Sequence, residues 1–195
     1  MFYDNINIIN NPNKIDILVN KQNKLPEDYI PIDLEPINSD YTIGMQYLRH
    51  EAKINFEEMC KKAKNDGYYI KAVSSFRSSD YQEKLYNNYC IEKGIEYADM
   101  CSARKGHSEH QTGLAVDIAD NFDDYNEFAN TKEFNWIKDN AFKYGFILRY
   151  PKFKTDITGF KYEPWHFRYI GIDIANYIYN NNIALEEYYE KKLND

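Results

Sequence analysis

Three of the four histidines of this chain fall in two short segments whose residue types suggest chemistry rather than ordinary surface. The first segment covers residues 106–118 and places His110 just before a run of small and apolar residues. Asp117 lies inside this run, between Val116 and Ile118. A buried carboxylate needs a cation, a metal or several hydrogen-bond donors. The segment therefore predicts a polar site, and the alternative is a loop histidine near a hydrogen-bonded aspartate.

Glu163 and His166 lie three positions apart in the second segment, residues 162–169. Residues at this spacing face opposite sides of a regular strand. A helix, in which they would share a face, is unfavourable here because Pro164 does not fit the interior of a helix. Both side chains can therefore reach one site only if the chain bends at Pro164. The aromatic neighbours of His166 would then surround that site with apolar surface. The alternative is a polar edge strand that carries an ordinary histidine.

Together the two segments contain the residue types of a catalytic zinc site. Two histidines and one carboxylate leave the fourth position of the ion open for water, and His110, Asp117 and His166 fit this ligand role. Zinc lowers the pKa of such a water towards ~7. An unliganded carboxylate nearby can then take its proton and return it to a leaving amine, a role that Glu163 fits. The chain has no H-E-x-x-H motif, so the site is not of the helix-borne type.

Arg77 lies in a serine-rich segment, residues 74–79, at a predicted junction between a strand and a helix. A guanidinium group placed there can bind a substrate carboxylate, or stabilise the oxyanion that forms when a peptide carbonyl is attacked. The alternative is an arginine in a structural ion pair. Residues 79–82 have the spacing of a capping box, so helix capping alone would account for Gln82.

Hydrophobic periodicity and glycine stops predict the elements that position these residues. The expected helices cover residues 45–63, 79–93 and 134–144, with two short ones at the C-terminal end. The expected strands cover residues 68–73, 114–118, 146–150 and 162–169, with a turn at 155–159. Residues 101–113 are expected to form a polar loop, and the proline-rich residues 21–44 an extended arm on the surface. This order predicts a single-domain α+β fold with a largely antiparallel central sheet flanked by helices.

Composition excludes several classes of protein. A chain of 195 residues suggests one domain, and 16% aromatic residues are too many for a disordered chain. The net charge of −7 opposes general binding to nucleic acid. The mean hydropathy is −0.75, and no apolar run approaches the ~20 residues of a membrane span. The chain has three cysteines, Cys60, Cys90 and Cys101, and no C-x-x-C pair. An odd number without this motif argues against a disulfide framework and a structural zinc site, so we expect free thiols.

Two of these motifs, taken together, resemble a known group of enzymes. The pattern S-x-H-x-x-G-x-A-x-D at residues 108–117, followed by Glu-Pro-Trp-His at 163–166, is similar to the LAS group of zinc peptidases. The Phe-Arg-Ser element at 76–78 and residues 145–151 narrow the resemblance to D-alanyl-D-alanine carboxypeptidases of the VanY type and their VanXY relatives. The resemblance covers roughly residues 15–190.

The resemblance implies a role for each matching residue. It implies one zinc ion on His110, Asp117 and His166, with Glu163 as the catalytic base. It implies that Arg77 contacts the substrate or the transition state, and that Ser108 and Gln82 help to bind the substrate. Outside the motifs, His107 is expected either behind the metal ligands or at the rim of the site, and His50 on the surface. Residues 1–20 would form an N-terminal arm and residues 21–195 the carboxypeptidase domain.

The implied reaction is zinc-dependent removal of the terminal D-Ala from peptidoglycan stem peptides or precursors. L,D-carboxypeptidase action on tetrapeptide stems and D,D-dipeptidase action on D-Ala-D-Ala remain alternatives. A further alternative, of another class, is a non-catalytic module that binds wall peptides. Glu163 argues against it, because a site without activity does not need a catalytic base. Residues 1–20 lack the features of a signal peptide. We therefore expect the cell envelope if a leader or anchor is missing from this chain, and otherwise the cytoplasm.

Overall fold

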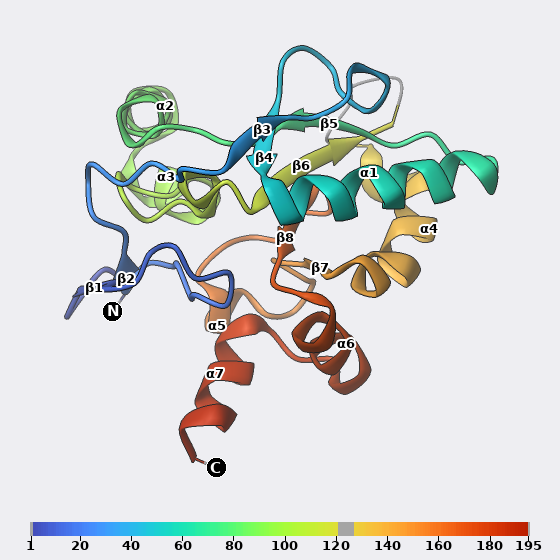
Figure 1. The fold of residues 1–195 in the computed structure, drawn as a ribbon. Helices are drawn as coiled ribbons and strands as arrows, with labels where there is room; N and C mark the ends of the chain where they lie inside the picture. The colour runs from blue at the N-terminus through green and yellow to red at the C-terminus, as the bar shows by residue number, and fades with distance from the viewer. Residues whose placement is uncertain (1, 121–126, 195) are drawn as a thin grey trace.

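A four-stranded sheet in the order β5-β6-β8-β7 lies at the centre of this computed structural model (Figure 1). The structure describes residues 2–120 and 127–194. Every strand pairing in this sheet is antiparallel, which confirms the predicted α+β fold with a largely antiparallel sheet. The strands are β5 (Lys71–Ser74), β6 (Ala115–Ala119), β7 (Phe146–Leu148) and β8 (His166–Tyr169).

Helices surround this sheet, and two small strand pairs lie outside it (Figure 1). The helices are α1 (His50–Asn65), α2 (Ser79–Lys93), α3 (Ile95–Cys101), α4 (Lys132–Asn140), α5 (Thr155–Thr158), α6 (Ile172–Asn181) and α7 (Leu185–Asn194). The small pairs are β1 (Asn7–Ile8) with β2 (Asn23–Lys24), and β3 (Leu34–Pro36) with β4 (Tyr47–Arg49). Short 3-10 helices include η2 (Glu109–Thr112), which leads into β6, and η4 (Ala141–Tyr144).

Side-chain alternation gives β6 and β8 one apolar face and one polar face. Val116 and Phe167 are fully buried in the main core, where they pack with Phe56 of α1. Asp117 and His166 project to the opposite face, and they are direct partners in the register between the two strands. Pairing of β6 with β8 therefore brings together two residues that are 49 positions apart in the sequence.

A second core attaches the C-terminal helices to the edge of the sheet. Ile147 of β7 and Ile170, which follows β8, pack against Ala175 and Ile178 of α6 and Leu185 of α7. Figure 1 shows α6 and α7 below β7 and β8. Helix α7 therefore lies close to β7, and Leu185 packs in the same apolar cluster as Ile147.

One predicted helix start and one predicted helix cap were wrong. The first helix begins at His50 rather than residue 45, because Tyr47–Arg49 pairs with Leu34–Pro36 as a strand. The second helix is capped by Ser78, whose side chain accepts a hydrogen bond from the Tyr81 amide. The predicted capping box at residues 79–82 is therefore wrong, and Gln82 is free to bond elsewhere.

Other corrections concern the segments predicted to be irregular. The expected polar loop at residues 101–113 follows a helix that the sequence analysis missed, α3, and contains η2, whose four residues are all buried. The expected surface arm at residues 21–44 also reaches inward, because Leu25 and Ile37 are buried. The turn at 155–159 contains one helical turn, α5. The boundary at residue 20 between arm and domain stays a prediction.

Two further expectations concern cysteines and membrane spans. The three cysteines are free, as predicted, and Cys60 lies on the buried face of α1. In the part of the chain that the structure describes, no helix has the length and apolar character to cross a membrane.

Candidate active site

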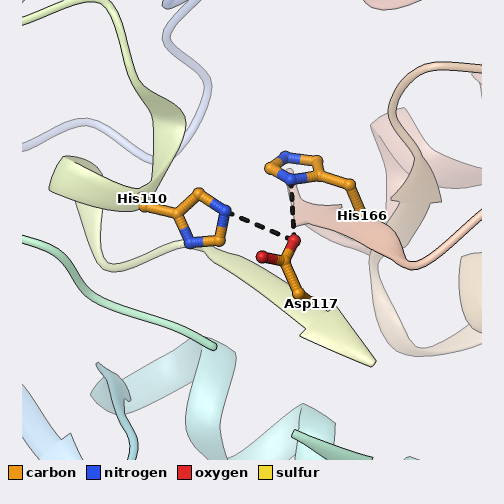
Figure 2. A group of neighbouring side chains, drawn as sticks. All are labelled: His110, Asp117 and His166. Carbon is orange, nitrogen blue, oxygen red and sulfur yellow. Dashed lines mark hydrogen bonds and ion pairs between the residues drawn. The ribbon is translucent and has the colours of Figure 1, made fainter. Parts of the chain in front are cut away.

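His110, Asp117 and His166 form a compact, buried cluster on the polar face of the sheet (Figure 2). The Nε2 atom of His110 lies 3.3 Å from Oδ1 of Asp117, and Nδ1 of His166 lies 3.0 Å from the same oxygen. One potential ligand atom from each residue lies within 4.8 Å of the others. The structure therefore brings together the three residues that the sequence predicts as ligands.

Local backbone geometry explains how His110 reaches this cluster. Gly113 ends η2 in the left-handed region, with φ +65°, and turns the chain into β6. A Cβ atom on Gly113 would lie 2.7 Å from a side-chain carbon of Leu34, and the Gly113 carbonyl accepts a hydrogen bond from the Arg49 amide. A side chain at this position would therefore disturb both the turn and the packing beside His110.

The protonation of His110 fits a metal ligand. Its Nδ1 atom donates a hydrogen bond to the Ser75 carbonyl at 2.6 Å, which leaves a lone pair on Nε2. Within the described residues, Nε2 is buried and has no hydrogen-bond partner. Burial lowers the pKa of His110 to about 4, so the ring is neutral at physiological pH. A neutral ring whose free nitrogen faces a carboxylate is suited to share a cation with it.

His166 presents its two ring nitrogens to two different carboxylates. Its Nδ1 faces Asp117, and its Nε2 lies 3.2 Å from Oε2 of Glu109. Burial alone would lower the pKa of His166, but the hydrogen bonds to Asp117 and Glu109 raise it to about 9. A metal ion that binds beside Asp117 therefore has to displace the proton on Nδ1.

Glu163 lies next to the cluster but outside it. The His166 amide donates to the Glu163 carbonyl at 3.3 Å, which closes a turn at Pro164 and directs both side chains into one site. This is the bend that the sequence analysis required. The Glu163 carboxylate is 3.9 Å from His166 Nδ1, and burial raises its pKa to about 7. A carboxyl group with this pKa can both accept and donate a proton near neutral pH.

Arg77 approaches the cluster from the junction between β5 and α2. Its backbone amide donates to the His110 carbonyl at 3.2 Å, which ties the two segments together. Its Nη2 atom is 3.9 Å from Oδ2 of Asp117, too far for a hydrogen bond. Its Nε is buried without a hydrogen-bond partner among the described residues. This guanidinium group therefore has donors left for a ligand, which a saturated structural ion pair would not.

A cavity of about 870 Å³ opens beside the cluster. Gln82 lines it, and its Nε2 donates to Ser102 Oγ and to the Ala103 carbonyl. These bonds fix the amide so that Oε1 is buried without a partner in the described part of the chain. Ser108 also lines the cavity, and its Oγ accepts a hydrogen bond from the His110 amide. Gln82 therefore offers an acceptor to a ligand in this cavity.

Of the two aromatic neighbours of His166 that the sequence predicts as a wall, Trp165 lines the cavity, whereas Phe167 lies on the other face of β8 and packs in the main core. Sequence reasoning missed the other aromatic residues of the cavity and the carboxylate behind His166. The wall comes from the β5–α2 junction, α2, α3 and the segments before β8. Its aromatic members are Phe76, Tyr81, Tyr89, Tyr97, Tyr150, Phe160, Tyr162 and Trp165. Tyr150 packs on the His166 ring, with centroids 4.9 Å apart. Glu109 immediately precedes His110, but the partners of its carboxylate, Arg149, His166 and Arg168, are all distant in sequence.

The other two histidines lie outside the cluster. His50 is on the surface, as expected, where its Nδ1 pairs with Glu35 at 2.7 Å. Of the two positions expected for His107, the rim was wrong, because His107 does not line the cavity. Its buried ring bonds to the Asn20 carbonyl and packs against Tyr3, so it fastens the N-terminal segment.

Comparisons with known proteins agree with this geometry. A family model described as VanY, D-alanyl-D-alanine carboxypeptidase, matches residues 45–172. The protein YodJ of Bacillus subtilis (strain 168), a provisionally assigned carboxypeptidase, is 44% identical over 96% of this chain and 71% of its own length. A D-alanyl-D-alanine carboxypeptidase of Enterococcus faecalis (strain ATCC 700802 / V583) is 36% identical over 88% of this chain and 64% of its own length.

Solved structures give the same fold. The LD-carboxypeptidase LdcB has a TM-score of 0.90 at 44% identity, covering 96% of this chain and 91% of LdcB. VanYB in complex with D-alanine-D-alanine has a TM-score of 0.79 at 33% identity, covering 90% and 97% of the two chains. A VanY mutant from a VanB-type resistance cassette, solved with Zn(II), has a TM-score of 0.78 at 34% identity, covering 89% and 98%.

Proposed function

This chain belongs to the VanY family of D-alanyl-D-alanine carboxypeptidases and is a metallocarboxypeptidase of peptidoglycan peptides, and we propose that it removes the terminal D-Ala from stem peptides or their precursors. The observation that carries this proposal is the His110-Asp117-His166 cluster, which lines the cavity together with Glu163 and Arg77. Its location, at the cell envelope or in the cytoplasm, stays a prediction.

The donor set of the cluster fits a zinc ion. Two imidazole nitrogens and one carboxylate oxygen are the ligands of many catalytic zinc sites, and they leave a coordination position for substrate or water. When bound, zinc supplies Lewis-acid chemistry: it polarises the carbonyl of the scissile bond and makes a water molecule more acidic. His110, Asp117 and His166 would hold one such ion per chain.

The residues around the cluster supply the remaining steps of hydrolysis. The Glu163 carboxylate accepts a proton from the attacking water and transfers it to the nitrogen of the departing D-Ala. The Arg77 guanidinium group donates hydrogen bonds to the peptide oxygen as negative charge develops there, or to the terminal carboxylate of the substrate. Gln82 Oε1 accepts a hydrogen bond from a peptide N–H, and Ser108 lines the same wall. The aromatic wall excludes water from the peptide.

L,D-carboxypeptidase activity on tetrapeptide stems is the second candidate, because the similarity to the LD-carboxypeptidase LdcB extends over nearly the whole chain. D,D-dipeptidase activity on D-Ala-D-Ala is a further alternative, since a bifunctional VanXY enzyme is among the relatives. Mass spectrometry of pentapeptide, tetrapeptide and D-Ala-D-Ala after incubation with the zinc-loaded protein separates them. Loss of one D-Ala from the pentapeptide supports our proposal, whereas cleavage confined to the tetrapeptide or the dipeptide contradicts it.

Replacement of Arg77 by alanine should leave the fold and zinc content intact but reduce kcat/KM by about 10²–10³, the usual effect of removing one oxyanion donor. Lysine should restore little, because it lacks the planar pair of donors. Arg104→Ala is the matched control, since Arg104 pairs with Asp99 and does not line the cavity. Near-normal turnover in Arg77→Ala would make Arg77 a structural residue.

A further inference from the structure

Glu109 holds the metal-site histidine His166 from the side opposite the proposed ion. It is fully buried, and its Oε2 atom lies 3.2 Å from Nε2 of His166. Its Oε1 atom accepts hydrogen bonds from Nε of Arg149 at 2.8 Å and from Nη1 of Arg168 at 3.1 Å. Although Glu109 is adjacent in sequence to His110, its carboxylate therefore contacts the second histidine of the cluster, His166.

These contacts determine which nitrogen of His166 can bind a cation. A carboxylate that already accepts bonds from two guanidinium groups can only accept from a third partner, so Nε2 carries the hydrogen. The other nitrogen, Nδ1, then points at Asp117 Oδ1, on the cluster side of the ring. A carboxylate in this position fixes both the tautomer and the orientation of a metal-bound histidine.

The two arginines that hold Glu109 are themselves anchored by the ends of the chain. Arg149 makes a two-pronged contact with Glu186 of α7, at 2.9 and 2.7 Å. Arg168 donates through Nη2 to the carbonyls of Ile15 and Ile17 in the N-terminal segment. All four charged side chains are buried, and the two carboxylates balance the two guanidinium groups. The position of Glu109 is thus set by segments far from the cavity.

We propose that Glu109 is a positioning residue for the metal site, which sets zinc affinity by fixing the His166 ring with Nε2 protonated and Nδ1 toward Asp117. This inference rests on the proposed zinc site. It assigns a role to the buried charges Glu109, Arg149 and Arg168 that fold stability alone does not require. An Arg149–Glu186 pair by itself would hold α7 against the sheet without any contact to His166.

Glu109→Gln and Glu186→Gln form a matched pair of variants for testing this role. Each one removes a buried negative charge from the same Arg149 and replaces it with a side chain of nearly the same size. Of these two glutamates, Glu109 alone contacts His166. If both glutamates only stabilise the fold, the two variants should have similar zinc affinities. If Glu109 positions His166, zinc affinity should fall in Glu109→Gln and not in Glu186→Gln.

The experiment measures zinc affinity by competition with a chelator, together with thermal unfolding of the metal-free proteins. We expect Glu109→Gln to weaken zinc binding by about 10–100-fold, the usual effect of losing a partner of a ligating histidine. Glu186→Gln should stay within about 3-fold of wild type, although both variants unfold at lower temperature. The visible spectrum of the cobalt(II)-substituted protein should change in Glu109→Gln and remain that of wild type in Glu186→Gln.

Wild-type zinc affinity and a wild-type cobalt spectrum in Glu109→Gln would overturn the proposal, as would equal losses of affinity in the two variants. If Glu109→Gln does not fold, nitrogen-15 spectra of the zinc-loaded wild type decide. They should show His166 protonated at Nε2 and zinc-bound at Nδ1, and the reverse assignment would refute the role of Glu109. A wild-type chain that binds no zinc would instead refute the proposed zinc site itself, so the two failures are distinguishable.

Discussion

Replacement of His166 by alanine is expected to abolish both zinc binding and peptide hydrolysis. The substitution removes one of three protein ligands and leaves Asp117 and Glu109 buried without their shared partner. Loss of a residue that only supports a metal ligand lowers metal affinity by up to ~10²-fold. Loss of a ligand itself should therefore lower zinc affinity by more than this. Zinc content after dialysis and the rate of D-Ala release are the measurements. His110→Ala should behave in the same way.

The control for this pair is His50→Ala, which removes a histidine from the surface of the same domain. His50 pairs with Glu35 and its side chain is 58% exposed, so the variant should retain wild-type zinc content and turnover. Full metal occupancy in His110→Ala or His166→Ala would remove that residue from the ligand set. Normal hydrolysis without metal would contradict the proposed mechanism altogether.

Replacement of Glu163 by glutamine should separate metal binding from catalysis. Glutamine preserves the size of the side chain, and all three proposed ligands remain, so zinc content should stay at wild-type level. Turnover should fall by at least about 10²–10⁴, the usual contribution of a positioned acid–base group. The acidic limb of the pH–rate profile should disappear as well, because an amide does not titrate. Metal analysis and kcat across a pH series measure these effects.

Two results would contradict this role, and they point in different directions. Loss of zinc from Glu163→Gln would make Glu163 a ligand and free Asp117 or His110 for another role. Retained activity with an intact acidic limb would place the base elsewhere. His107 is a poor substitute, since its ring bonds to the Asn20 carbonyl and does not line the cavity.

Local sequence patterns were sufficient to predict the four strands of the central sheet and the residues that they present. The run of small and apolar residues around Asp117 predicted a carboxylate on a buried strand. The proline between Glu163 and His166 predicted a bend before the next strand. The pairing of β6 with β8, which places Asp117 opposite His166, is a long-range choice that no local pattern contains. The two motifs predicted one shared site only because both are needed to supply two histidines and one carboxylate as zinc ligands.

The errors occurred where tertiary contacts override local preference. Residues 101–113 are polar enough for an exposed loop, yet His107 and His110 are buried because partners from distant segments satisfy their polar atoms. Met45 and Leu48 continue the helical spacing of α1, but Leu48 is buried in β4 instead. The charge network of Glu109 could not be predicted either, since Arg149 and Arg168 are 40 and 59 positions away.

Titration of zinc into the metal-free protein, with D-Ala release from a pentapeptide stem as the readout, tests the account most directly. Activity should be absent without metal and should rise in proportion to added zinc until one equivalent per chain, because the described residues contain one cluster of suitable ligands. His50→Ala should follow the same curve, and Glu163→Gln should bind the same equivalent while remaining nearly inactive. Hydrolysis that persists after complete removal of zinc, or that bears no relation to the zinc bound, would contradict a zinc carboxypeptidase.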